Sequence, residues 1–422
     1  MTTADDIFDE SFDNISQLGL IEIPFTESPI DLESETLQRI FTGRTDELRQ
    51  VFNLLQSRER RRILVYGRLG IGKSAFLLEV LSVLRRKRPQ MLTTYISLPK
   101  DLDLATTALI ALARAMDDDE WAQRQLYQMG IPTRNAAKER SMELNTGIPS
   151  VFGGKASAKD LPITKPLYPE VSLDTLLERA QEKYPKGILI AIDDLDKRNP
   201  SVVRQLMHDA QGMLKGRAWF MLTGHPAGMP GDLLTSDRGL FDLQLELKEL
   251  NQPTTYRMLI NYLSSARLDN DCTDPEDPRC VLPFLPETAK RFCEVSMGKP
   301  RLFNRLGSTV LSTAADLQAT QITPDVLEQG LRKMAPTLRE QAALTAQEEK
   351  VRLLLLRRGG LSDETISMED LQSLGVRSFS DILHILERLE EADLAHQVRQ
   401  DDAKAFEPIP LPAADEETLP QQ

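Results

Sequence analysis

Apolar and polar residues follow one another along this chain in two distinct patterns. Short runs of consecutive apolar residues, such as Ile63–Tyr66 and Ile188–Ile192, are typical of strands that are buried on both faces. The segments after them repeat apolar residues every three or four positions, as residues 75–84 do, which is typical of helices. Strands and helices in this order predict an α/β fold with a parallel sheet and helices on both faces.

The same patterns predict the other elements. Further strands are expected at 91–98 and 219–225, and further helices at 104–116 and 202–214. Residues 117–170 carry the weakest pattern, and their polar stretch 144–155 predicts a hairpin or a mobile loop. The later helices are expected at 254–263, 286–295, 344–356, 368–374 and 378–391, before a short hairpin from 394–398 and 405–408.

The strand at Ile63–Tyr66 runs directly into a glycine-rich loop. Gly67–Ser74 matches the phosphate-loop pattern G-x-x-x-x-G-K-[ST] at every position. We expect Gly67, Gly70 and Gly72 to permit backbone angles that a side chain would prevent, so that successive N–H groups point at one anion. The helix that follows adds the positive end of its dipole. The loop therefore predicts a site for a nucleoside triphosphate.

Each side chain of this loop has an expected role. Lys73 is expected to reach the β- and γ-phosphates, and the Ser74 hydroxyl is expected to bind Mg²⁺. The rest of the nucleotide-binding loop is then formed by Arg68, Ile71 and Ala75 together with the three glycines. No Asn-Lys-x-Asp guanine motif is present, although spacing alone does not choose ATP over GTP.

Two carboxylates follow the buried strand at Ile188–Ile192. In a phosphate-loop fold this strand and acid pair are the Walker B motif. Asp193 is expected to hold Mg²⁺ beside Ser74. Asp194 is expected to orient or deprotonate the attacking water, which predicts hydrolysis as well as binding.

A further motif precedes the phosphate loop by some 20 residues. Gly43–Leu48 reads Gly-Arg-x-x-Glu-Leu, and Gly298–Arg301 near the other end reads Gly-x-Pro-Arg. With the loop and the acid pair, these motifs resemble those of AAA+ and STAND ATPases of the initiator-like group. The resemblance implies a P-loop sheet with a small helical lid and a C-terminal winged helix. It also implies ATP and Mg²⁺ as ligands, with Gly43 and Arg44 against the adenine and ribose.

The resemblance implies roles for four more residues. Thr223 is the first choice for the residue that senses the γ-phosphate, and His225 is the second. Arg238 is the candidate finger that would reach a neighbouring subunit's γ-phosphate. Arg301 is expected to meet the phosphates from the lid. The sequence departs from many AAA+ enzymes in having Asp rather than Glu at position 194.

Five segments are expected along the chain. Residues 1–37 form an acidic and partly disordered arm, which is either a solvated tail or an acidic interaction arm. Its part from Leu18 to Phe25 could pack in extended form on the following domain. Residues 38–250 form the ATPase domain, in which 117–170 is either a partner-contacting insertion or a flexible connection. The helical lid, the winged-helix domain and a disordered tail are expected at 251–335, 336–410 and 411–422.

Composition and charge restrict the partners. The net charge of −13 and the pI near 5.0 disfavour broad binding to nucleic acid or to acidic membranes. Clusters of arginine at 58–62 and 85–88 could still contact phosphates, or could be solvated helix ends. The predicted third helix of the winged-helix domain, Ser378–Glu391, is acidic, which favours protein contact over DNA reading.

The expected compartment is the cytoplasm. No apolar run approaches the ~18–20 residues that span a bilayer, and the acidic N-terminus lacks the order of a signal peptide. The three cysteines have no paired C-x-x-C spacing, which argues against zinc, against disulfides and for reduced thiols.

Three functional hypotheses follow. The first is an ATP-hydrolysing switch that assembles or remodels a protein complex, with protein partners and a homo-oligomer. The second is an ATP-dependent factor that loads a partner onto DNA in replication, transposition or defence. The third is a nucleotide-locked scaffold without turnover, against which the two carboxylates argue.

Overall fold

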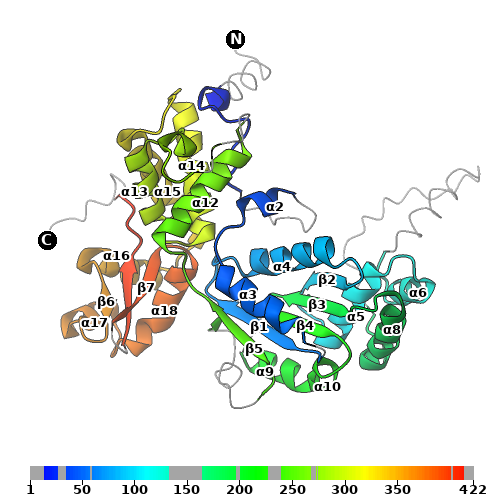
Figure 1. Ribbon diagram of the computed structural model, residues 1–422. Helices are drawn as coiled ribbons and strands as arrows, with labels where there is room; N and C mark the ends of the chain where they lie inside the picture. The colour runs from blue at the N-terminus through cyan, green and yellow to red at the C-terminus, as the bar shows by residue number, and fades with distance from the viewer. Residues whose placement is uncertain are drawn as a thin grey trace, which may run out of the picture.

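The computed structural model describes residues 14–26, 35–57, 59–132, 164–195, 200–226, 239–267, 272, 274–400 and 403–412. These residues form a layered α/β domain, a helical lid and a small C-terminal domain, shown from blue to red in Figure 1. The expected hairpin or loop at 144–155, Arg58, Arg238 and the tail from 413 lie outside the described residues.

The α/β domain is built on five parallel strands in the order β2-β3-β4-β1-β5. Their bounds are β1 Arg62–Gly67, β2 Leu92–Ser97, β3 Ile188–Asp193, β4 Trp219–Gly224 and β5 Leu243–Leu247. Every residue of β3 and β4 is buried, as consecutive apolar residues require. The predicted parallel sheet of a P-loop α/β fold is thus confirmed.

Helices cover both faces of this sheet (Figure 1). One face packs against α5 Leu104–Ala115, α6 Glu120–Gln128, α8 Pro169–Lys183, α9 Pro200–Asp209 and α10 Gln211–Leu214. The other packs against α3 Thr45–Leu54 and α4 Lys73–Lys87. The prediction of one helix over 202–214 is wrong, because Ala210, with ψ of 2°, interrupts it.

The lid is a helical unit with its own core. It contains α12 Gln252–Ser265, the 3₁₀ turn η4 Pro278–Val281, α13 Pro286–Val295, α14 Pro300–Asp316 and α15 Pro324–Ala342. The helices predicted at 254–263 and 286–295 are present, and α14 and α15 add two more. The predicted boundary at 335–336 falls inside α15, which continues through Pro336.

The N-terminal segment and α2 Glu35–Ile40 also contribute to the lid core. Phe25 stacks on Tyr262 at 5.5 Å between ring centroids and lies at 6.0 Å from Phe292. A side chain at Gly307 would collide with the Phe25 ring, 2.4 Å from its Cγ. The segment does pack on the folded protein, but its aromatic partners belong to the lid rather than to the α/β domain that follows it in the chain.

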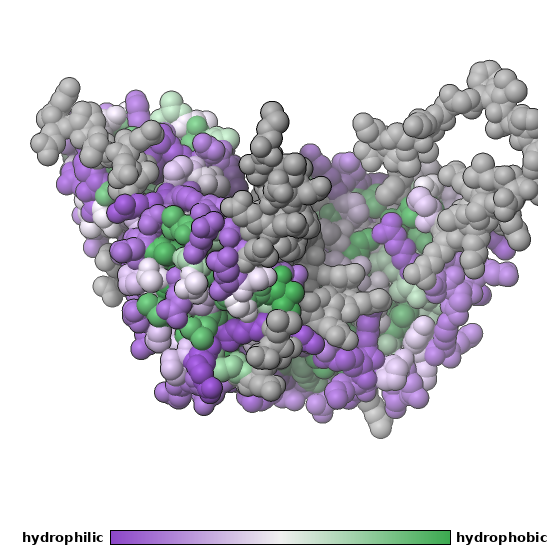
Figure 2. All heavy atoms as spheres, turned by 90° about the horizontal axis from the view of Figure 1, so that it is seen from above, coloured by the Kyte–Doolittle hydropathy of each residue, from purple (hydrophilic) through white to green (hydrophobic). Residues whose placement is uncertain are grey.

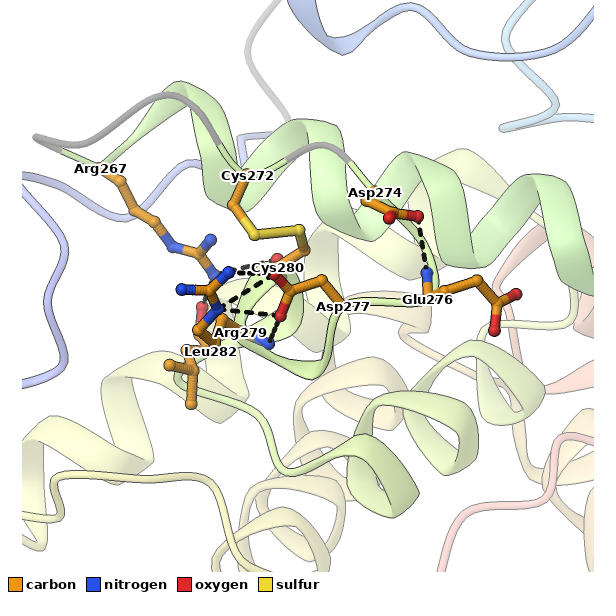
Figure 3. Close-up of a disulfide and its surroundings, with 8 residues drawn as sticks. All are labelled: Arg267, Cys272, Asp274, Glu276, Asp277, Arg279, Cys280 and Leu282. Atoms are coloured by element: carbon orange, nitrogen blue, oxygen red, sulfur yellow. Dashed lines mark hydrogen bonds and ion pairs between the residues drawn. A yellow bond between two sulfur atoms is a disulfide. The ribbon is translucent and has the colours of Figure 1, made fainter.

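The loop between α12 and α13 holds a disulfide between Cys272 and Cys280 (Figure 3). Asp277 caps η4 by accepting from the N–H of Arg279, and this turn brings the two cysteine Cα atoms to 5.0 Å. The expectation of free thiols is wrong for this pair. Cys293 is free and buried.

The C-terminal domain has the element order α16 Ala346–Arg358, β6 Leu361–Ser362, α17 Met368–Leu374, α18 Ser380–Glu391, β7 Ala395–Gln400 and β8 Ala403–Pro408. Its strands form an antiparallel sheet in the order β6-β8-β7. This agrees with the predicted three helices and hairpin, to which β6 is added. The domain lies below the lid and beside the α/β domain (Figure 1).

The surface mixes polar and apolar residues. On the face seen in Figure 2, apolar residues form small groups between polar ones. None of the helices in the described part of the chain is both long enough and apolar enough to cross a membrane.

Candidate functional site

The loop Gly67–Ser74 connects the end of β1 to the start of α4. Gly70 and Gly72 have φ of 76° and 94°, in the left-handed region that favours glycine. Gly67 does not have a positive φ, so the prediction that it needs backbone angles reserved for glycine is wrong at this position. Glycine fits at 67 for another reason: a Cβ would lie 2.6 Å from the Leu247 carbonyl oxygen of β5.

Lys73 and Ser74 begin α4 at the end of this loop. The Lys73 ammonium donates to the carbonyl oxygens of Gly67 at 2.9 Å and Arg68 at 3.1 Å. Ser74 is exposed on the first turn of the helix. The glycine cradle, the ammonium and the helix N-terminus together form a donor set suited to phosphate.

The two carboxylates lie at the end of β3 and are held by different groups. Asp193 is 2% exposed, and its Oδ1 accepts from the Thr223 hydroxyl and, at 3.0 Å, from the Asp194 N–H. The same N–H donates to Thr223 Oγ1 at 3.0 Å. Asp194 has a φ of 65°, which is uncommon outside glycine. Ser74 and Asp193 offer the oxygen ligands that Mg²⁺ prefers.

Two hydroxyls of β2 contact this pair, and the sequence reasoning missed both. Tyr95 donates to Asp193 Oδ2 at 2.8 Å, and Ser97 donates to Asp194 Oδ2 at 2.5 Å. Burial raises the pKa of Tyr95 above its usual range, and the neighbouring Asp193 carboxylate raises that pKa further. The alternation of Tyr95 and Ser97 along a strand next to the acid pair was the available signal.

The predicted adenine segment lies between the α/β domain and the lid. Arg44 donates to the Ile71 carbonyl oxygen of the loop at 3.3 Å and pairs with Glu47 at 3.5 Å. A Cβ at Gly43 would lie 2.7 Å from Thr254 of α12. A small cavity of about 60 Å³ is lined here by Leu37, Ile40, Phe41, Thr42, Arg44, Ile71, Gly72, Ala75, Leu250, Met258, Tyr262 and Pro300.

The lid turn touches the phosphate loop directly. The Arg301 N–H donates to the Gly70 carbonyl oxygen at 3.1 Å, and a Cβ at Gly70 would lie 2.8 Å from Arg301 Cβ. Lys299, two residues earlier, is 2% exposed and lines a second cavity. The lid therefore brings two cations to the loop, of which the sequence reasoning named only Arg301.

This second cavity, of about 680 Å³, joins the loop to the C-terminal domain. Arg68 Nη1 lies 2.5 Å from Glu390 Oε1 of α18 and donates to the Gln397 carbonyl oxygen at 3.2 Å. Lys299 Nζ lies 4.0 Å from the same Glu390 oxygen. The acidic helix predicted to avoid DNA thus presents a carboxylate to the loop.

Two histidines line the same cavity, His225 after β4 and His396 on β7. Burial, then Lys73 and Arg68, lower the pKa of His225 to about 4. Burial, then Lys299, lower the pKa of His396 to about 4. Both imidazoles are therefore neutral at pH 7. Of the two sensor candidates, Thr223 contacts the Asp193 carboxylate and the Asp194 N–H, and His225 lines the cavity.

The arginine clusters make contacts within the α/β domain. Arg61 and Arg62 pair with Asp242 at 3.2 and 3.0 Å, which ties β1 to the start of β5. Arg60 lies 4.2 Å above the Trp219 ring. In the second cluster, Arg85 donates to Thr93 Oγ1 at 3.0 Å. Arg60, Arg61, Arg62 and Arg85 thus each have a partner within the α/β domain.

Comparison with known protein families gives one match, over the part of the chain that holds most of this site. Residues 40–214 match the family described as the AAA ATPase domain. No curated protein matches the sequence.

Three solved structures illustrate the more distant similarity. Cdc6p from Pyrobaculum aerophilum is 15% identical, with 92% of this chain and 93% of that chain covered and a TM-score of 0.43. Orc1 from Aeropyrum pernix, solved in complex with DNA, is 13% identical, with 89% and 91% covered and a TM-score of 0.45. The RuvB Holliday junction branch migration motor of Thermotoga maritima is 15% identical, with 87% and 93% covered and a TM-score of 0.41. No residue role is transferred from similarity at this level.

Proposed function

Residues 40–214 match the AAA ATPase domain family, and from that match we propose that the protein is an ATP-binding and ATP-hydrolysing switch. The lid and the predicted winged helix transmit the state of the nucleotide to protein partners. Such a switch needs a physical connection from the phosphates to the parts that move.

One observation carries this proposal: the phosphate loop contacts the lid and the C-terminal domain at once. Gly70 accepts from the Arg301 N–H of the lid. Arg68 pairs with Glu390 of α18. A triphosphate bound to the loop would add negative charge beside Arg68 and Arg301. Binding and release of the nucleotide would therefore change the strength of both contacts.

The residues of the site divide the chemistry among them. Lys73 and the N-terminus of α4 bind the phosphates, with Arg301 facing them from the lid. Ser74 and Asp193 hold Mg²⁺, which when bound neutralises charge on the phosphate oxygens. Asp194 orients the attacking water and accepts its proton. Thr223 or His225 senses the γ-phosphate, and Gly43 and Arg44 border the adenosine.

Phosphate release tests the ATPase role. The wild-type protein should release phosphate from ATP, whereas Lys73→Ala should lose nucleotide binding and Asp194→Asn should bind ATP without turning it over. Equal rates in all three proteins would contradict hydrolysis at this site.

The same role predicts an assembly that depends on nucleotide. Arg238 is the proposed finger toward a neighbouring subunit, so ATP should favour a homo-oligomer. Light scattering after size exclusion, with ATP and with ADP, measures this. An identical mass in both states would argue against a finger supplied between subunits.

The alternative of a DNA-loading factor has less support. Arg60, Arg61, Arg62 and Arg85 are engaged within the α/β domain. The predicted third helix turns Glu390 toward the phosphate loop. A salt-dependent mobility shift with ATP that is lost in an Arg60→Ala variant would restore this alternative.

A further inference from the structure

Strand β2 offers one hydroxyl to each of the two carboxylates. Tyr95 Oη lies 2.8 Å from Asp193 Oδ2, and Ser97 Oγ lies 2.5 Å from Asp194 Oδ2. We propose that Tyr95 and Ser97 are positioning residues of the nucleotide site. Tyr95 holds Asp193 in place for the metal, and Ser97 holds Asp194 in place for the attacking water. This inference rests on the proposed ATPase function.

The register of the sheet puts both hydroxyls where they can do this. In the parallel pair of β2 and β3, Tyr95 is opposite Ala191 and Ser97 is opposite Asp193. Residues two apart on a strand share a face, so Tyr95, Ser97 and Asp193 all point toward the same side of the sheet. The Tyr95 ring packs in the core on the side of α4, the helix that carries Ser74.

Tyr95 therefore connects the two proposed metal ligands. Its hydroxyl donates to Asp193, and its ring packs on the side of α4, the helix whose first turn carries Ser74. Asp193 is 2% exposed, so the protein groups around it set its orientation instead of bulk water. Partners that orient a metal-binding carboxylate in this way commonly change metal affinity when they are removed.

Ser97 meets Asp194 because the backbone turns there. Regular alternation after β3 would send the Asp194 side chain to the face opposite Asp193. The φ of 65° at Asp194 breaks this alternation, and its carboxylate instead meets Ser97, the partner of Asp193 in the sheet. A residue held in this sparsely populated region needs fixed neighbours, and Ser97 is one of them.

The Tyr95 arm is tested by nucleotide binding, not turnover. Affinity for a fluorescent ATP analogue is measured in EDTA and across a Mg²⁺ titration. Tyr95→Phe should bind as wild type does in EDTA, while its half-saturating Mg²⁺ concentration rises about 10- to 100-fold. Tyr184→Phe, which removes a hydroxyl beside Lys183, should respond to Mg²⁺ as wild type does. A wild-type Mg²⁺ response in Tyr95→Phe would overturn this arm.

The Ser97 arm is tested by single-turnover hydrolysis. Ser97→Ala should keep the wild-type Mg²⁺ response and lose about tenfold in rate, the size of one hydrogen bond to a charged group. Ser97→Thr keeps the hydroxyl and should recover most of the rate. A wild-type rate in Ser97→Ala, or no recovery in Ser97→Thr, would overturn it.

Two controls separate this inference from the function it rests on. Lys73→Ala binding nucleotide as tightly as wild type would remove the proposed function itself. Loss of binding in Lys73→Ala together with wild-type behaviour of Tyr95→Phe and Ser97→Ala would remove only the positioning roles. Thermal unfolding in EDTA without nucleotide verifies that each variant is folded. If Tyr95→Phe is unstable, the comparison of Ser97→Ala with Ser97→Thr still tests the inference.

Discussion

His225 and His396 show how single residues respond to the cavity beside the phosphate loop. Each imidazole is half-buried and lies near cations, so protonation is disfavoured and each pKa is lowered to about 4. Nδ1 of His396 has no hydrogen-bond partner among the described residues. An unfolded chain would protonate both rings near pH 6.5.

This difference predicts a loss of stability in acid. Between about pH 6.5 and 4 the unfolded chain binds more protons than the folded one, so stability falls as the pH falls through that window. Above pH 6.5 the two histidines do not make the free energy of unfolding depend on pH. Urea unfolding at several pH values should show a shallower decline for the double variant His225→Gln and His396→Gln than for wild type. His208→Gln, at an exposed position, should leave the decline unchanged; a similar decline in all three proteins would contradict the assignment.

At the scale of elements, the N-terminal segment is part of the lid. Phe25 is 4% exposed and lies among Tyr262, Phe292 and Phe303. The Ile21 N–H donates to the Ala266 carbonyl oxygen at the end of α12. An acidic arm by composition is thus anchored by a few apolar side chains.

Truncation of the Phe25 ring should therefore destabilise the lid. Phe25→Ala should lower the free energy of unfolding by about 3–5 kcal/mol, as for other large core residues. Ile21→Ala, at a side chain that is 52% exposed, should change it by less than about 0.5 kcal/mol. Urea unfolding measures both, and a Phe25→Ala change as small as that of Ile21→Ala would show that the segment does not pack in solution.

The disulfide in the loop between α12 and α13 predicts how many cysteine thiols react before and after reduction. The unfolded and unreduced chain should show one reactive thiol, Cys293, and three after reduction. In the folded protein Cys293 should react slowly, because burial raises its pKa to about 12. Cys293→Ser should show none before reduction. Three thiols in the unreduced wild type would contradict the Cys272–Cys280 pair.

At the scale of the whole molecule, three units meet at the phosphate loop. Arg68 pairs with Glu390 of the C-terminal domain, and Arg305 of the lid pairs with Asp393 at 3.4 Å. The carboxylate of Glu390 also accepts from the Gln397 N–H at 2.9 Å. Movement of the C-terminal domain away from the loop would break the Arg68–Glu390 contact.

We predict that loss of this contact favours nucleotide. Arg68 pairs with two carboxylates, Glu390 and, at 3.5 Å, Glu249. Glu390→Ala should remove the nearer one and raise ATP affinity about fivefold, equivalent to about 1 kcal/mol for a partly exposed ion pair. Glu369→Ala, at an exposed position on α17, is the matched control. The effect should shrink as salt concentration rises. Unchanged or weaker ATP binding in Glu390→Ala would mean that the contact does not oppose nucleotide.

The sequence by itself determined the elements that carry local signals. The phosphate loop at Gly67–Ser74, the buried strand before Asp193 and the helices of the C-terminal domain follow from spacing, glycine and apolar runs, and each was found at its predicted place. Local patterns suffice for these because strands buried on both faces and amphipathic helices differ in period.

Only the tertiary structure decided which distant residues meet. It joined Tyr95 and Ser97 to the carboxylates, Glu390 to Arg68, Phe25 to the lid and Cys272 to Cys280. The structure also shows why glycine is needed at position 67. The backbone of β5 lies too close for a side chain, whereas the motif implied a need for unusual backbone angles. Contacts between residues far apart in the chain depend on strand order, register and domain placement, and these are set by how complete surfaces pack rather than by any local pattern.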